Sequence, residues 1–207
     1  MRQDDRQKSK EETARDNTMN ILNQQLTNIS AENQYVTFQV ADEEYGIDVL
    51  KVQEIIRYHQ PTKLPNAPEV IQGVLNFRGE VIPILDIRRK FSLGDKEYDS
   101  FNVIIVIEIK DKIVGIIVDH VSDIISFTED QIQETLQFSS QINTQFIRGM
   151  AQLEDRLVIL LDLEKLLSFE EFKAVHQLEE SDLQEEEKQK NKEKAADNLE
   201  TKNKEME

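Results

Sequence analysis

The sequence predicts a mainly β protein, either a sandwich or a set of small barrels, built from two copies of one strand-rich unit. Short apolar segments alternate with polar turns through the middle of the chain, and long helical patterns are few. All six glycines and all four prolines lie between positions 46 and 149, and every aromatic residue lies between Tyr35 and Phe172. Because turn-forming and core-forming residues are confined to the middle, we expect residues 34–169 to form the folded domain.

Alternating apolar residues in this middle region predict strands that short polar turns join into hairpins. The expected hairpins pair 34–41 with 45–49, 74–77 with 81–85, and 102–109 with 112–118, and a further buried strand covers 156–161. Short helices are expected at 50–55, 68–72 and 86–91, and a longer one at 162–178 with a break at Ser168.

An internal comparison indicates that this region is a duplication. Gly46 aligns with Gly115 at an offset of 69 residues, and Gly73 aligns with Gly149 at an offset of 76. The first offset also superposes Val52 on Val121, Glu54 on Asp123 and Ile55 on Ile124, and the second superposes 82–86 (IPILD) on 158–162 (VILLD). Because the matches keep the same order along the chain, we expect two similar units that pack on each other.

We expect residues 1–33 to form a polar tail without stable structure, and residues 170–207 to hold the end of the last helix and an acidic disordered tail. The C-terminal tail carries 13 acidic and 7 basic residues and has too few large aliphatic side chains to offset the entropy lost on ordering. The N-terminal tail has apolar residues at helical spacing, namely Met19, Leu22, Leu26 and Ile29. This stripe either marks a docking helix or stays unstructured, because so short a helix rarely holds in water alone.

The composition excludes several functional classes. The 207 residues include 41 acidic and 25 basic side chains, a formal charge of −16, which argues against a nucleic acid as partner. The chain has no cysteine, so disulfides, thiolate metal sites and thiol nucleophiles are excluded. No apolar run approaches the ~20 residues that span a bilayer, and the polar start does not resemble a secretion signal. We expect a cytoplasmic protein.

The residues that could carry catalysis form no recognisable constellation. The chain lacks the glycine-rich phosphate loops, the dinucleotide fingerprint and the serine elbow, and its histidines (His59, His120 and His176) lack the spacing of a zinc helix. Asp86, Asp119 and Asp123 are the best candidates for a metal-dependent enzyme, but Asp86 and its counterpart Asp162 each begin a helical stretch, where capping explains them. We therefore expect no enzyme, and a function that resides in surfaces.

One hairpin differs between the two copies in a way that suggests such a surface. Asn76-Phe77-Arg78-Gly79 in the first copy aligns with Gln152-Leu153-Glu154-Asp155 in the second. Gly79 permits a tight turn with positive φ, and Arg78 projects a fork-shaped hydrogen-bond donor at the rim. Arg78 is either a binding residue or an incidental cation on a turn.

Four blocks of the middle region, in order and at matching spacing, resemble the CheW family of chemotaxis coupling proteins. They are 42–55 (DEEYGIDVLKVQEI), 73–87 (GVLNFRGEVIPILDI), 114–123 (VGIIVDHVSD) and 162–167 (DLEKLL). The resemblance implies two interleaved, SH3-like five-stranded β-barrels related by pseudo-symmetry, at roughly 34–100 and 101–169. It also implies a non-catalytic adaptor, without cofactor or metal, that couples a CheA-type histidine kinase to methyl-accepting chemoreceptors in membrane-bound arrays. An adaptor of the same fold for a non-chemotactic histidine kinase is the alternative.

Carried over position by position, the resemblance implies a set of receptor- and kinase-binding residues. They are Val49, Val52, Glu54, Gly73, Asn76, Arg78, Gly79 and Val121. Glu54 and Arg78 are expected to form an ion pair near a groove between the barrels. The valines are expected to receive apolar anchors from the helical hairpin tip of the receptor. The kinase partner is expected to bind through its own CheW-like regulatory domain. Phe77 departs from the family pattern, which has Leu there.

Overall fold

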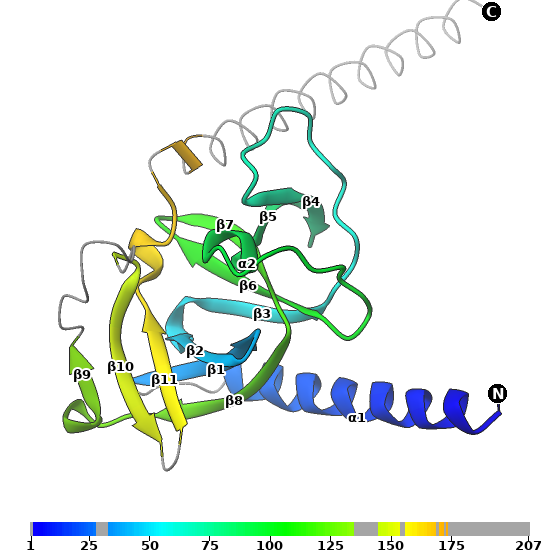
Figure 1. Cartoon of the computed structure of the whole chain (residues 1–207), viewed down its shortest axis with the longest axis horizontal. Coiled ribbons are helices and arrows are strands. Elements are labelled where there is room, and N and C mark those ends of the chain that lie inside the picture. Colours follow the sequence, from blue (N-terminus) through cyan, green and yellow to red (C-terminus); the bar gives the residue numbers. More distant parts are fainter. Residues whose placement is uncertain are drawn as a thin grey trace, which may run out of the picture.

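The computed structural model describes residues 2–27, 33–134, 145–153, 156–168, 170, 171 and 173, with the backbone alone for residues 2–12. Within these ranges, strands dominate (Figure 1). The elements in chain order are α1 (Arg2–Leu26), β1 (Gln34–Val40), β2 (Glu43–Asp48), η1 (Val49–Lys51), β3 (Val52–Arg57), β4 (Ile71–Phe77), β5 (Glu80–Asp86), α2 (Ile87–Lys90), β6 (Val103–Ile109), β7 (Lys112–Val118), β8 (His120–Ser126), η2 (Glu129–Gln131), β9 (Ile132–Glu134), β10 (Ile147–Leu153), β11 (Arg156–Leu161) and η3 (Leu163–Lys165). The expected hairpins and the strand at 156–161 are all present, which confirms the prediction of a mainly β protein.

The strands form two sheets of matching order. The first sheet runs β8-β1-β2-β11-β10-β9, and the second runs β3-β6-β7-β5-β4. Each sheet contains one parallel pair, β11 with β2 in the first and β5 with β7 in the second, and its other pairs are antiparallel. Beyond β3 the chain turns back to β4, where Thr62 and Val74 exchange two backbone hydrogen bonds of 2.9 Å. This bridge brings the continuation of one edge of the second sheet to its other edge, as a barrel requires.

The two copies exchange their first hairpins. The second sheet draws its strands from 52–118, and the first sheet draws its strands from 34–48 and 120–161. The hairpin β1–β2 therefore lies in the sheet that otherwise belongs to the second copy, and the equivalent hairpin β6–β7 lies in the sheet of the first copy. The sheets are interleaved as expected, but neither follows the predicted boundaries of 34–100 and 101–169.

The strand registers repeat between the sheets. Gly46 on β2 pairs with Leu160, and Gly115 on β7 pairs with the equivalent residue, Ile84. A Cβ atom on Gly46 would lie 2.9 Å from the Leu160 side chain, and one on Gly115 would lie 2.5 Å from the Ile84 side chain. Close packing of a branched side chain on bare backbone thus explains both glycines, and the repeated contact supports the predicted duplication.

The aligned pair Gly73 and Gly149 has a similar explanation. A Cβ atom on Gly73 would lie 2.3 Å from the carbonyl oxygen of Thr62, and one on Gly149 would lie 2.8 Å from that of Gln133. Gln133 is on β9, so β9 is the counterpart, in the first sheet, of the Thr62 bridge in the second. Both glycines let the returning chain approach the sheet closely.

Three apolar clusters make up the core, and the largest lies between the sheets. Alternate residues of β1 and β6 point into it, namely Val36, Phe38, Val40, Ile105, Ile107 and Ile109. The intervening residues enter two smaller clusters, one inside each sheet: Tyr35 packs with Val158 and Leu160, and Ile104 packs with Ile82 and Ile84. Because the largest cluster is shared, we expect the sheets to unfold as one unit.

Only some of the predicted helices are present in the structure. The helix expected at 86–91 is present as α2, and Asp86 accepts a hydrogen bond from the backbone N–H of Arg89 as its cap. The helix expected at 50–55 is wrong, because a single 3₁₀ turn leads directly into β3. Residues 68–72 form no helix either; a turn there leads into β4. Of the helix expected at 162–178, η3 is present and Ser168 makes reciprocal capping hydrogen bonds with Glu171; most of its remainder lies outside the described residues.

The N-terminal segment differs most from its prediction. Residues 2–26, expected to be an unstructured tail, form α1, which packs against β3 and β8 (Figure 1). Leu22 of the apolar stripe is only 4 % exposed, and Met19 and Leu26 pack against the shared core. Ile29 lies outside the described residues. The docking alternative is therefore confirmed for this stripe, and the C-terminal tail, beyond its first few residues, lies outside the described ranges.

Candidate functional site: the groove between β3 and β8

The repeat places two equivalent edge strands around one cavity. β3 is the outer strand of the second sheet and β8 is the outer strand of the first. The pairing of Val52 with Ile107 on one edge repeats as that of Val121 with Phe38 on the other, and both strands carry a register shift one step later. Residues of both strands line one cavity of about 260 Å³ beneath α1. We call the surface between β3 and β8 the inter-sheet groove.

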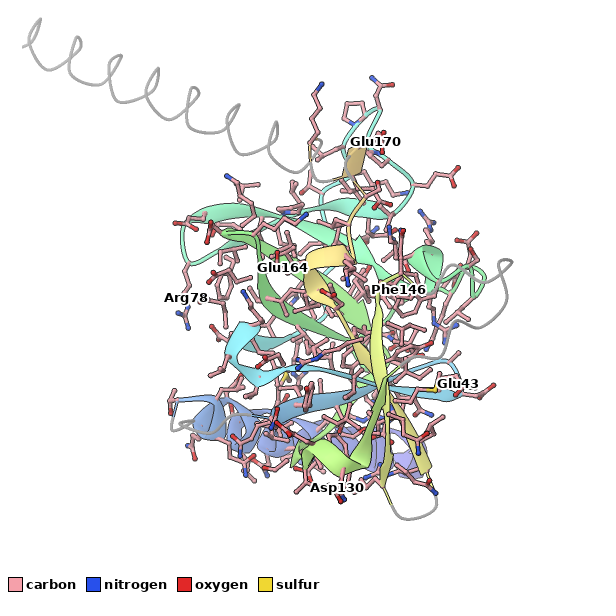
Figure 2. All side chains as sticks on the ribbon, turned by 90° about the vertical axis from the view of Figure 1, so that its left-hand side faces the viewer. Glu43, Arg78, Asp130, Phe146, Glu164 and Glu170 are labelled. Atoms are coloured by element: carbon pink, nitrogen blue, oxygen red, sulfur yellow. The ribbon has the colours of Figure 1, made fainter. Side chains whose placement is uncertain are left out.

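Arg78 lies at the tip of the β4–β5 hairpin and reaches β3, one of the two strands of the groove. Its guanidinium Nη2 is 2.5 Å from Glu54 Oε2 on β3, which confirms the expected ion pair. The Arg78 side chain is 68 % exposed, and Figure 2 shows it extending from the margin of the molecule. Its guanidinium carbon also lies 5.1 Å from the centre of the Phe77 ring, so the aromatic residue that departs from the family pattern supports the cation.

The hairpin turn holds Arg78 in an unusual backbone conformation. Arg78 and Gly79 both have positive φ, 54° and 94°, in a two-residue turn closed by the pair Phe77–Glu80. This turn type normally has Asn, Asp or Gly at its first position. Asn76 Oδ1 accepts a hydrogen bond of 3.1 Å from the Gly79 N–H and braces the turn. The positive φ that the sequence assigned to Gly79 alone thus extends to the arginine itself.

The predicted valines occupy two different environments. Val52 and Val121 are partly buried on their edge strands and pack against the shared core, and Val121 lines the cavity beneath α1. Val49 is 2 % exposed and belongs to the core, so it supports the groove from within. Gly73 sits at the Thr62 bridge of β4, where close packing accounts for it. The structure therefore brings together Val52, Glu54, Arg78 and their turn, and it separates Val49 and Gly73 from the surface.

Helix α1 covers much of the groove through contacts that the sequence analysis did not anticipate. The side-chain amide of Asn23 donates to the carbonyl oxygen of Ile55 at 2.8 Å and accepts from its N–H at 2.9 Å. Asp16 forms an ion pair with Arg57, and Arg15 donates to the carbonyl oxygen of Phe101. The apolar stripe was the available signal for this helix, but a single asparagine gives no indication of pairing with a strand edge.

The three carboxylates considered for metal chemistry do not share a site. Asp86 caps α2 and accepts a hydrogen bond of 2.7 Å from the Tyr98 hydroxyl, whose pKa is raised by burial and by this bond. Asp123 accepts from the backbone N–H of Ile124 on β8. In the described part of the chain, no three His, Asp or Glu side chains are grouped to hold a metal ion.

Asp119 is the centre of a polar network that joins the two sheets. Its carboxylate accepts hydrogen bonds from Arg88 at 2.7 Å, Lys96 at 2.6 Å and the Ala41 N–H at 2.8 Å. Burial by itself would raise the pKa of Asp119, but these three donors together lower it below its usual value. The network accounts for Asp119 as a structural ion.

Comparison with known proteins identifies the family. A family model described as a CheW-like domain matches residues 34–171. The chain belongs to the CheW-like family. The chemotaxis protein CheW of Klebsiella aerogenes is 44 % identical over 142 residues, which cover 69 % of this chain and 86 % of that protein. The chemotaxis protein CheW of Rhizobium meliloti is 35 % identical over 149 residues, covering 72 % of this chain and 95 % of that protein.

A solved structure agrees with this assignment. The scaffolding protein TtCheW from Thermoanaerobacter tengcongensis is similar to this chain with a TM-score of 0.63 and 32 % identity, over 68 % of this chain and 96 % of that one. The predicted resemblance, fold and role as a chemotaxis scaffold are thereby confirmed for this CheW-like protein. Helix α1 precedes the stretch matched by the family model. None of the described helices is long and apolar enough to cross a membrane.

Proposed function

We propose that this CheW-like protein couples the regulatory domain of a CheA-type histidine kinase to the helical hairpin tip of methyl-accepting chemoreceptors. It acts without catalysis and without a cofactor, in the cytoplasm, where it is recruited to receptor arrays in the membrane. The observation that carries this proposal is the Arg78–Glu54 ion pair, which holds an exposed cation on β3, one of the two strands that border the groove.

The geometry suits a protein that binds two partners by two surfaces. The inter-sheet groove offers partly buried apolar side chains, Val52 and Val121, of the kind that receive an amphipathic helix. The tip of the β4–β5 hairpin offers the guanidinium of Arg78, held in direction by Glu54 and by the turn. The valines pack on the shared core, and Phe77 beside Arg78 packs on the cluster inside the second sheet. Because β3 contributes Ile55 to one cluster and Ile56 to the other, a partner bound at one surface is held in fixed relation to a partner at the other, and binding free energies can couple.

A reconstituted assembly tests this proposal. The full chain is mixed with a soluble receptor cytoplasmic fragment and a CheA-type kinase, and complex formation and kinase autophosphorylation are measured. Arg78→Ala is expected to reduce recovery of the three-component complex and kinase control. The matched control is Arg156→Ala, which removes an exposed arginine, paired with Glu44 at 3.0 Å, from the equivalent hairpin of the other sheet.

The outcomes separate the protein's role from that of one residue. If the unaltered chain recovers neither kinase nor receptor fragment, the proposed coupling is overturned. If Arg78→Ala and Arg156→Ala both behave like the unaltered chain, the coupling stands and Arg78 has no part in it. Recovery of the kinase without the receptor fragment would indicate an adaptor for a non-chemotactic kinase.

A further inference from the structure

Helix α1 shows what kind of ligand the inter-sheet groove accepts. Its apolar residues at helical spacing, Met19, Leu22 and Leu26, all face the shared core. Leu22 is 4 % exposed, whereas its neighbour Ile21 is 57 % exposed. The groove therefore holds one face of an amphipathic helix, with a leucine as the central anchor.

Next to this anchor, Asn23 makes the backbone hydrogen bonds that a neighbouring strand would make with β3. β3 pairs with β6 on one side, and no strand in the described part of the chain pairs with its other side. The Asn23 amide offers one donor and one acceptor, as a peptide group does, and satisfies both groups of Ile55 at 2.8 and 2.9 Å. The groove thus recognises an amide side chain adjacent to the central apolar anchor.

Charged and aromatic contacts fix the position of the helix along the groove. Asp16 pairs with Arg57 at the end of β3. Arg15 donates to the Phe101 carbonyl at 3.2 Å and lies 4.8 Å from the centre of its ring. These contacts lie one to two turns before the Leu22 anchor, so α1 is held over its C-terminal half, from Arg15 to Leu26.

Two helices would occupy the same surface, namely α1 and the proposed receptor helix. Val121, assigned above to the receptor helix, lines the cavity that α1 covers, together with Met19 and Leu22. Two helices cannot occupy one apolar groove at once. We infer that α1 is an internal ligand of the inter-sheet groove, and that a receptor helix binds by displacing it, using the same combination of apolar face and adjacent amide. This inference rests on the proposed function.

A pair of neighbouring substitutions tests the displacement. Leu22→Asp places a carboxylate at the buried anchor, and Ile21→Asp places the same carboxylate on the exposed side of the same helix turn. Opening of the groove is measured first, without any partner, as faster hydrogen exchange of the Ile55 amide, which Asn23 otherwise protects. Affinity for a receptor cytoplasmic hairpin fragment is then measured by titration.

We expect Leu22→Asp to expose the Ile55 amide and to tighten fragment binding about tenfold, because the competent state becomes the major one. Ile21→Asp is expected to match the unaltered chain in both measurements. If Leu22→Asp fails to fold, Asn23→Ala with Asn20→Ala as its control replaces the pair. Equal fragment affinity despite an exposed Ile55 amide overturns the displacement and leaves the proposed function standing. Absence of binding to both the closed and the opened chain overturns the proposed function, and the inference with it.

Discussion

Asn23, on a helix that precedes the family domain, makes two hydrogen bonds to the backbone of Ile55 on the edge strand β3, at 2.8 and 2.9 Å. A helix side chain here completes a sheet edge. We expect Asn23→Ala to leave both groups of Ile55 unpaired and to weaken the docking of α1 by about 1–3 kcal/mol. The measurement is hydrogen exchange of the Ile55 amide. Asn20→Ala, which alters an exposed asparagine of the same helix, is the control, and equal exchange in both variants would contradict the role of Asn23.

The Arg78–Glu54 pair is expected to matter for binding and little for folding. The Arg78 side chain is largely solvated, and exposed ion pairs contribute no more than about 1 kcal/mol. Arg78→Ala should therefore change the free energy of unfolding by less than about 1 kcal/mol, measured by urea denaturation. A loss well above that value would show that any failure of assembly reflects damage to the fold.

Gly115 is expected to tolerate alanine less well than its equivalent, Gly46. A Cβ atom on Gly115 would lie 2.5 Å from Ile84 Cδ1 and 2.8 Å from Ile104 Cγ2, whereas one on Gly46 would meet Leu160 Cδ2 at 2.9 Å. Overpacking of this kind costs about 1–3 kcal/mol, so Gly115→Ala should lower the unfolding free energy by about that amount.

A second substitution tests the cause of that loss. Ile84→Val removes the Cδ1 atom nearest to the new methyl group. Combined with Gly115→Ala, it should recover part of the stability in a double-mutant cycle, because the remaining crowding comes from Ile104. Strict additivity of the two changes would contradict the packing explanation.

Asp119 is expected to make the protein sensitive to acid. Its pKa is lower in the folded than in the unfolded chain, so its contribution is present above the ordinary value of 3.8 and is lost as pH falls through the folded pKa. Asp119→Asn should destabilise the protein by about 3 kcal/mol near neutral pH, because Arg88 is left buried without its counter-charge. The difference from the unaltered chain should shrink as pH is lowered below about 4.

Thermal or urea unfolding at several pH values measures this effect. Asp123→Asn, which makes the same change at an exposed carboxylate of β8, is the control. A constant difference between the Asp119→Asn variant and the unaltered chain across the acid range would show that Asp119 contributes by its shape and not by its charge.

The hairpins and the duplication could be predicted because they depend on local patterns, whereas the interleaving of the two copies followed only from the family resemblance. Gly46 packs against Leu160 and Gly115 against Ile84, and both partners are branched aliphatic residues of equal size. The sequence pattern is equally compatible with each glycine packing inside its own copy. Which partner is chosen depends on the path of the connecting chain, and alternation of apolar residues carries no information about that path.

The errors around the site have similar causes. The segment 50–55 resembles a helix in its pattern because the register shift near Val52 breaks the alternation typical of a strand. The ion pair of Arg78 with Glu54 follows only from the family resemblance, since the two residues lie far apart in sequence. Helix α1 has the composition of a tail because its stability comes from packing on β3 and β8, and not from its own sequence.

The exchanged hairpins determine the symmetry of the surface between β3 and β8. Two identical chains that exchanged hairpins would form a domain-swapped dimer with a two-fold axis. Here the two copies that exchange hairpins belong to one covalent chain, so the arrangement is that of such a dimer within a single molecule. The groove lies between the equivalent strands β3 and β8, so its backbone alone would accept a helix in either direction. The side chains remove that ambiguity: the first copy places Arg78 and Glu54 where the second has Glu154 and Asp123. Under the proposed function, this difference in charge between the two copies would let a docked partner helix bind in one direction only.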